Sequence, residues 1–312
     1  MNTNPNSLNA TKTHRNAVAL MVGCALLMSI SGIVTRQLTS ATGFELTFWR
    51  SLVAGCFVLI WLIAVHGRRW YRSVLDLGRV GLLSGFFWSV MFTCFMLALT
   101  LTTVAKTMVV LAVAPLLTAL LSWLILDLRI AWRTWLAIFV AGIGIVWMVS
   151  DALSGDAAYP HSLWGMLVAA GVPLASACNL VLMKKTQARI DLQPAVLVGA
   201  IISTLVMLPL ALPGQASGHD IAWLAFLGVF QLGLPCTLLV VAARHLSPQE
   251  TALLVLLEVI FAPVWVWIGA SEEPASATLW GGALVLSALI GNELATMHQH
   301  SRRNRASAQA IV

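Results

Sequence analysis

TVAKTMVVLAVAPLLTALLSWLIL, at Thr103–Leu126, contains a single charged residue, Lys106. A helix that crosses the hydrocarbon core of a bilayer needs about 20 predominantly apolar residues. A run this long and this apolar is typical of a membrane-spanning helix rather than of a strand or a surface helix. The stretch therefore predicts that the chain crosses a membrane at least once, and the rest of the sequence decides how often.

The whole chain has the same apolar character. Hydrophobic residues make up 59% of it and charged residues 10%, whereas a soluble domain is about 45–50% apolar and about 25% charged. Ten apolar runs with short junctions can be distinguished, and the third and fourth are divided at Thr100–Thr103 because a fused helix would be too long for a bilayer. The runs are Ala17–Gln37, Glu45–Val65, Gly78–Leu99, Thr103–Leu126, Trp132–Ser150, His161–Met183, Pro194–Leu212, Ile221–Ala243, Glu250–Ala270 and Leu279–Glu293. The sequence thus predicts an all-α membrane protein with ten transmembrane helices.

Positive charges predict the orientation of these spans. With ten spans, nearly all lysines and arginines in the junctions fall on the side of the N-terminus, as at Arg68, Arg69 and Lys184, and the opposite side holds only Arg36. Cytoplasmic loops carry an excess of Lys and Arg. Both termini are therefore predicted to be cytoplasmic, with tails at residues 1–16 and 296–312.

The two halves of the chain, residues 17–150 and 151–295, resemble each other. Lys106–Trp123 can be laid on Glu250–Trp267 at one constant offset. Each half contains five predicted spans, and an odd number makes the second half enter the membrane from the opposite side. Inverted repeats are a common plan of secondary transporters, whose substrate site lies near the midplane between the repeats. The halves therefore predict two inverted five-helix repeats and transport by alternating access.

Several short motifs carry a family resemblance. They are Phe48-Trp49-Arg50, Ala114-Pro115-Leu116-Leu117-Thr118-Ala119-Leu120-Leu121-Ser122-Trp123, Leu257-Glu258-Val259, Glu272-Glu273-Pro274 and Gly281-Gly282-Ala283-Leu284. Over roughly Ala17–Asn292 the chain resembles the drug/metabolite transporter superfamily, in its ten-span EamA branch. The resemblance implies a transporter of the plasma (inner) membrane that exports a small organic metabolite, such as an amino acid, a related amine or a drug-like solute. Two departures are Leu126-Asp127, where the family often has Gly-Glu, and Val259, where it often has proline.

Three ionisable residues inside predicted spans are candidate site residues. A charge near mid-membrane costs roughly 2.5–3.5 kcal/mol on insertion scales, so Glu258 should face the bundle interior. It could bind a substrate amine or carry a coupling proton, or it could be a structural carboxyl. Lys106 could pair with a substrate carboxylate or extend to the membrane interface. Arg50 could bind the solute, or it could form a salt bridge or anchor a helix end.

Polar and aromatic residues within spans form a second group of candidates. Ser31 meets Asn179 when the halves are aligned, so a symmetric site could use both, and Gln231 lies in the eighth run. The alternative for each is an interhelical hydrogen bond, which contributes roughly 1 kcal/mol or less. Trp88 and Trp265 lie deep in their spans, where a ring could stack on a planar or cationic solute or simply pack against lipid.

The sequence gives little support to other functions. It contains no HExxH, GxSxG or phosphate-loop motif and no acidic metal-binding pair. We therefore expect no enzyme, no metal and no cofactor, although a membrane-embedded enzyme acting on a lipid-linked substrate is the alternative. The basic residues lie in short clusters between apolar runs, so no nucleic-acid partner is expected. The expected partners are a small-molecule substrate and the lipid bilayer, with the protein a monomer or a homodimer.

Overall fold

The computed structural model describes residues 5–127, 130–153, 159–186, 192–243, 246 and 248–309, and these residues form helices and no strand. The elements are α1 (Pro5–Ser29), α2 (Ser31–Thr35), α3 (Gly43–His66), η1 (Gly67–Arg69), α4 (Trp70–Leu75), α5 (Gly78–Leu101), α6 (Val104–Ala112), α7 (Ala114–Leu126), α8 (Trp132–Leu153), α9 (Ser162–Thr186), α10 (Leu192–Ala211), α11 (Gly218–Phe226), the π-helix η2 (Leu227–Gly233), α12 (Leu234–Ala243), α13 (Pro248–Ala270) and α14 (Ser276–Gln309). The predicted all-helical class is confirmed.

Helix length and composition support a membrane location. Eight helical segments of the described chain are long and apolar enough to cross a bilayer, and two further apolar helices, Leu254–Ala270 and Ser276–Asn292, are shorter within the described residues. Large apolar side chains cover the outside of the bundle: Trp132 is 81% exposed and Ile268 is 74% exposed. An exterior of this kind is suited to lipid rather than to water.

Three of the predicted spans are interrupted within their length. α1 ends at Ser29 and α2 resumes at Ser31, and α6 gives way to α7 at Val113. η2 separates α11 from α12, immediately before Pro235. Proline has no N–H to donate to the carbonyl four residues earlier, which explains the interruptions beside Pro115 and Pro235. By contrast, Pro173 and Pro263 lie inside the continuous helices α9 and α13.

The predicted division between the third and fourth runs is also present. α5 ends at Leu101, and Thr102 has extended backbone angles. Thr103 then caps α6, because its side-chain oxygen accepts a hydrogen bond from the N–H of Lys106 at 3.2 Å. A threonine in this position satisfies one of the N–H groups that the first turn of a helix leaves unpaired.

The principal helix contacts join the two halves of the chain. α3 packs on α10, α5 on α9 and α10, α7 on α9, α8 on α14, and α1 on α12 and α13. The pattern is reciprocal. In one direction the third run (α5) and the fourth (α6 and α7) pack on the sixth (α9), and in the other the eighth run (α12) and the ninth (α13) pack on the first (α1). The halves are therefore interleaved rather than set side by side.

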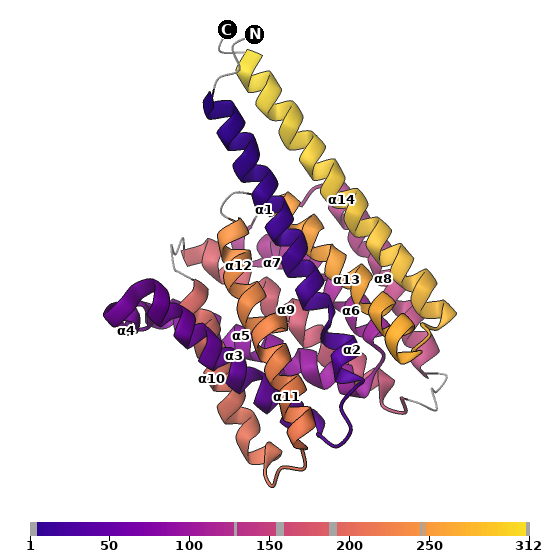
Figure 1. Cartoon of the computed structure of the whole chain (residues 1–312). Coiled ribbons are helices and arrows are strands. Elements are labelled where there is room, and N and C mark those ends of the chain that lie inside the picture. Colours follow the sequence, from indigo (N-terminus) through magenta and orange to yellow (C-terminus); the bar gives the residue numbers. More distant parts are fainter. Residues whose placement is uncertain are drawn as a thin grey trace.

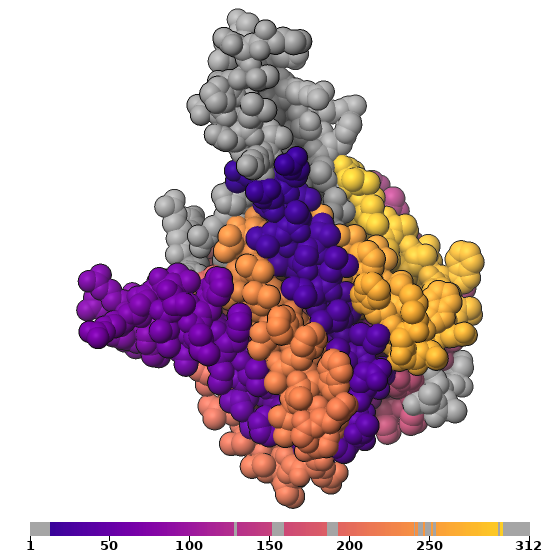
Figure 2. Space-filling model, viewed as in Figure 1, coloured from indigo at the N-terminus to yellow at the C-terminus, as the bar shows by residue number. Residues whose placement is uncertain are grey.

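The two ends of the bundle differ. The start of α1 and the end of α14 project from the same end, which we call the tail end, and η1 and α4 extend sideways (Figure 1). On the face shown in Figure 2, α1 lies between the α11–α12 segment and the C-terminal helix. The opposite end, which we call the loop end, carries the connections at 36–42, 102–103, 212–217 and 271–275.

Candidate functional site

Arg50 is the largest polar side chain that is fully buried among the described residues. It lies within α3 and is 1% exposed. Its Nη1 donates a hydrogen bond to Oε1 of Gln231 at 2.9 Å, and its Nη2 donates to the backbone carbonyl of Phe92 at 3.0 Å. The guanidinium also lies over the rings of Phe92 and Phe95. Arg50 thus ties α3 to α5 and to η2, while its Nε has no hydrogen-bond partner.

Gln231, the partner of Arg50, lies on the π-helical segment of the eighth span. η2 packs against α3, and at Gly228 an added Cβ would lie 2.8 Å from the carbonyl oxygen of Arg50. Only glycine fits so close to the facing backbone. The amide nitrogen of Gln231 points to the carbonyl of Met28 at 3.5 Å, so Gln231 bridges α3 and α1. Short π-helical segments occur frequently at functional sites.

Glu258 brings a carboxyl group to the same region. It lies on α13, is 8% exposed and interacts electrostatically with Arg50. Among the described residues, no hydrogen bond and no ion pair within 4.0 Å joins its carboxylate to another side chain. Arg50 is held by Gln231 and Phe92, whereas Glu258 is uncommitted. A buried carboxyl whose identified partner, the Arg50 charge, lies beyond ion-pair distance is costly to maintain, which makes it the strongest candidate for a group that binds something else.

The first span adds two serines beside this region. Nε1 of Trp265 donates a hydrogen bond to Oγ of Ser29 at 2.9 Å, and Ser29 donates to the carbonyl of Leu26 at 2.7 Å. Ser31 begins the short helix α2 and is fully buried, and its Oγ has no partner in the structure. The interruption between α1 and α2 therefore lies between two buried hydroxyl groups.

The remaining predicted site residues lie elsewhere. Asn179 is on α9, which packs on α5 and α7, and its Oδ1 is buried without a hydrogen-bond partner. Trp88 packs against α10, where an added Cβ on Gly199 would lie 2.5 Å from the Cβ of Trp88. Lys106 is 2% exposed at the loop end and pairs with Asp151 at 3.2 Å. No contact given by the structure joins these three residues to Arg50 or Glu258, and their predicted roles in solute binding stay predictions.

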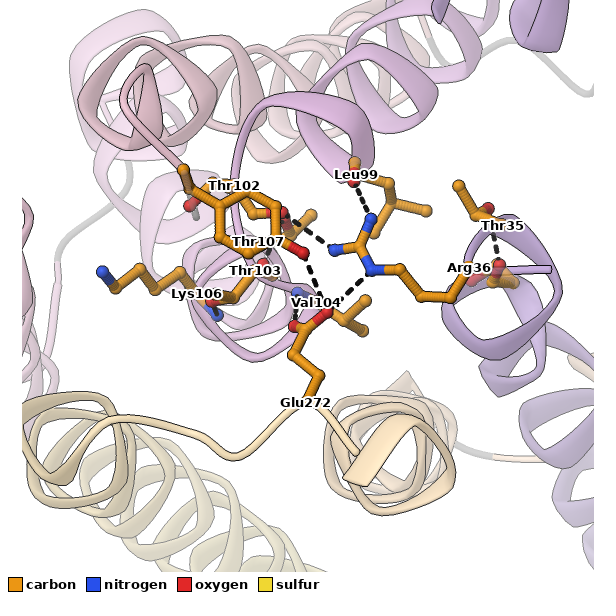
Figure 3. Close-up of polar contacts among 11 residues, drawn as sticks. Thr35, Arg36, Leu99, Thr102, Thr103, Val104, Lys106, Thr107 and Glu272 are labelled. Atoms are coloured by element: carbon orange, nitrogen blue, oxygen red, sulfur yellow. Dashed lines mark hydrogen bonds and ion pairs between the residues drawn. The ribbon is translucent and has the colours of Figure 1, made fainter. Parts of the chain in front are cut away.

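A second polar arrangement closes the loop end, and we call it the loop-end cluster. Its members are Arg36, Leu99, Thr102, Val104, Tyr159 and Glu272. Arg36 pairs with Glu272 at 2.7 Å, and the two side chains are 17% and 14% exposed. Figure 3 shows the guanidinium of Arg36 directed at Leu99 and Thr102, with Lys106 pointing away from Glu272. The Arg36 guanidinium also lies over the ring of Tyr159.

Both members of this ion pair also form hydrogen bonds with backbone groups. Nη1 of Arg36 donates to the carbonyl of Leu99 at 2.7 Å, and Nη2 donates to the carbonyl of Thr102 at 3.2 Å. On the other side, Oε1 of Glu272 accepts from the N–H of Val104 at 2.8 Å. These carbonyls end α5 and this N–H begins α6. A cation at a helix C-terminus and an anion at a helix N-terminus both match the helix dipole.

Two further carboxylates accept hydrogen bonds from the backbone of the loops at this end. Asp220, which is fully buried, accepts hydrogen bonds from the backbone N–H groups of Thr39, Ser40 and Ala41. In the opposite sense, Glu45 accepts from the backbone of residues 215 and 216. A residue of each half thus binds the loop of the other half.

The sequence showed Arg36 as a junction charge and Glu272 as part of a family motif, but it did not predict that the two side chains form a cluster. The available signal was their position, because Arg36 is the only junction cation predicted on a side that holds several carboxylates. Which carboxylate would pair with Arg36 was not visible in the sequence. Among the described residues, no group of three or more His, Cys, Asp or Glu side chains could hold a metal ion.

The apolar exterior, the long helices and the buried polar centre define a multi-pass helical membrane protein. The model of the EamA-like transporter family matches residues 15–150 and 163–292. The chain therefore belongs to the EamA-like transporter family, which confirms the resemblance found in the sequence. It is a membrane transporter of the drug/metabolite transporter superfamily, and the enzyme alternative is not favoured.

The similarity to solved structures supports the same fold. One solved chain, titled only as the crystal structure of a protein, aligns with 91% of this chain and with 99% of its own length, at a TM-score of 0.64 and 18% sequence identity. At this identity the similarity concerns the fold alone. No curated protein matches the chain.

Proposed function

We propose that this protein is a secondary transporter that exports a small organic metabolite, such as an amino acid, a related amine or a drug-like solute, by alternating access coupled to protons. In this proposal the protein forms two inverted five-helix repeats in the plasma (inner) membrane, with both termini cytoplasmic. The reciprocal packing of the two halves supports the inverted repeat, because two similar halves packed in opposite senses give two similar conformations.

The observation that carries the proposal is the uncommitted carboxyl of Glu258 beside the anchored Arg50. Arg50 is oriented by Gln231 and Phe92, so its positive charge is fixed. Glu258 can then exchange a proton for a solute amine without breaking an existing hydrogen bond. Intramembrane ionisable groups of this kind mark solute pathways and proton relays.

Other predicted residues would complete the site from both repeats. Ser31 and Asn179, which meet when the halves are aligned, each have a buried side-chain oxygen without a hydrogen-bond partner. Such groups are costly to leave unpaired, and a solute hydroxyl or amine would satisfy them. We propose that Ser31 contacts the solute when it is bound near α13, and that Asn179 does so in the other half of the cycle.

The test is Glu258→Gln in protein reconstituted into lipid vesicles. A screen of thermal stability against amino acids, polyamines, nucleosides and amphiphilic drugs first identifies a solute. We expect at least about a tenfold loss of proton-driven flux of that solute in the variant, since Gln keeps the shape but cannot carry a proton. We also expect that efflux by the unaltered protein stops when the proton gradient is dissipated.

The matched control is Glu273→Gln, because Glu273 is exposed and lies next to the loop-end cluster. Flux in this variant should equal that of the unaltered protein. Size-exclusion chromatography checks that Glu258→Gln is folded. Normal proton-driven flux in folded Glu258→Gln protein would refute the role of Glu258. Efflux by the unaltered protein that is independent of the proton gradient would indicate a uniporter.

A further inference from the structure

Two groups of helices meet at the loop-end cluster. The first group comprises α9 and the helices α5, α6 and α7, each of which packs on α9. The second comprises α1, with α12 and α13 packed on it, and α2, which packs on α13. The groups meet where α6 packs on α13 and where α2 packs on α5, so a change in the opening of the bundle at the loop end must alter these contacts.

The hydrogen bonds that Arg36 and Glu272 make to backbone groups cross the boundary between the two groups. Arg36 caps the end of α2, and Glu272 follows α13, so both belong to the second group. Their other hydrogen-bond partners are the carbonyls of Leu99 and Thr102 and the N–H of Val104, all in the first group. The hydroxyl of Tyr159, just before α9, also binds Glu272 at 3.2 Å. The two charges therefore join one group of helices to the other.

The polarity of the contact is specific. A helix leaves its last carbonyls and its first N–H groups without internal partners. Here the arginine donates hydrogen bonds to the carbonyls that end α5, and the glutamate accepts one from the N–H that begins α6. If the groups separated at the loop end, these backbone groups would lose their charged partners and would have to be hydrated instead. The same contacts are thus available only when the loop end is closed.

We propose that Arg36 and Glu272 form a latch that holds the loop end closed while the site is accessible from the tail end, and whose release opens the loop end. This inference rests on the proposed alternating access. In this proposal Arg36 and Glu272 control from which side of the membrane the site is accessible. This role is separate from the binding of solute and proton at Glu258.

The test measures access to a residue beneath the latch. Thr107 is fully buried on α6, one turn beyond Val104, and Thr107→Cys provides a reporter in a background whose five cysteines are replaced by alanine. Modification by a membrane-impermeant thiol reagent is followed in the full-length protein in vesicles. We expect Arg36→Gln and Glu272→Gln each to raise the modification rate at least about tenfold, because an open loop end becomes more populated.

A charge reversal distinguishes the latch from a simple ion pair. The double variant Arg36→Glu/Glu272→Arg restores opposite charges, yet it sets a carboxylate against the carbonyls of Leu99 and Thr102 and a guanidinium against the N–H of Val104. We therefore expect the rate to stay high in the double variant. A return to the parent rate would overturn the proposal, because the hydrogen bonds to the backbone of α5 and α6 would then not be needed for closure.

Two controls separate latch release from misfolding and from failure of the transport proposal. Glu273→Gln should leave the rate at the parent value, and Arg36→Lys, which keeps the charge but loses the two-pronged donor, should give an intermediate rate. Rates within about twofold of the parent in both glutamine variants would overturn the latch. Because labelling needs no solute and no gradient, that result is distinguishable from a failure of proton-driven flux in Glu258→Gln.

Discussion

Replacing Asp220 by asparagine should destabilise the protein far more than its position near a loop indicates. Asp220 is fully buried. Its Oδ2 accepts from the N–H of Ser40 at 3.0 Å, from the hydroxyl of Ser40 at 2.7 Å and from the N–H of Ala41 at 3.1 Å, while Oδ1 accepts from the N–H of Thr39 at 3.1 Å. The carboxylate therefore fixes the whole connection between α2 and α3.

The magnitude follows from these contacts. Asparagine has one acceptor oxygen, so its amide group must face at least one of the three backbone N–H groups, donor against donor. That loss costs roughly 1–3 kcal/mol, and the hydrogen bonds that remain fall from the roughly 1.5–3 kcal/mol of a charged acceptor to the roughly 0.5–1.5 kcal/mol of a neutral one. In the best amide orientation, which keeps oxygen toward Ser40 and Ala41, three hydrogen bonds remain and each weakens by roughly 1 kcal/mol, so the total is about 4–6 kcal/mol.

Equilibrium unfolding in mixed detergent or lipid bicelles, followed by circular dichroism, measures this change in the free energy of unfolding. Asp76→Asn is the matched control, because Asp76 is exposed, and it should change the free energy by less than about 0.5 kcal/mol. Ser40→Ala removes the hydroxyl contact to Asp220 and the acceptor of the N–H of Ser217, and it should cost about 1.5–3 kcal/mol. A change below about 1 kcal/mol in Asp220→Asn would show that the buried hydrogen bonds do not hold this loop.

Two other substitutions test the packing around the candidate site. Gly199→Ala should cost about 1–3 kcal/mol in the same unfolding assay, since the new Cβ would lie 2.5 Å from the Cβ of Trp88. The control Gly142→Ala, whose new Cβ meets nothing within 4 Å, should be neutral. Equal losses of stability in the two variants would contradict the close contact at Gly199. Trp265→Phe should cost about 0.5–1.5 kcal/mol through loss of its hydrogen bond to Ser29. The double variant Trp265→Phe/Ser29→Ala should lose less stability than the sum of the two single variants. Strict additivity would show that the two side chains do not interact in the membrane.

The helices themselves could be predicted from the sequence. In lipid every backbone polar group must be satisfied within its own segment, so a long apolar run determines a helix without reference to its neighbours. The division between α5 and α6 followed from length alone, and the structure places it at Thr102 and Thr103. Ten spans in two inverted repeats stay a prediction, although all ten predicted runs fall on helical segments.

The interior of each span was less predictable. Pro235 is visible in the sequence, but the π-helix that precedes it also depends on the contact of Gly228 with the backbone at Arg50. The break at Ile30 has no proline beside it. Such local departures from α-helical geometry depend on the surface of the facing helix, which no local pattern encodes.

The sequence by itself identified Arg50, Gln231 and Glu258 as important, because a polar group within an apolar run is costly wherever it lies. Only the tertiary structure decided that Gln231, 181 residues away, orients Arg50 and that none of the described side chains holds Glu258 in the same way. It likewise paired Arg36 with Glu272, 236 residues away, rather than with another carboxylate of the same side. The physical reason is that these spans are apolar around their whole circumference, so hydropathy sets their depth in the membrane but not their rotation, and rotation alone determines which polar groups meet.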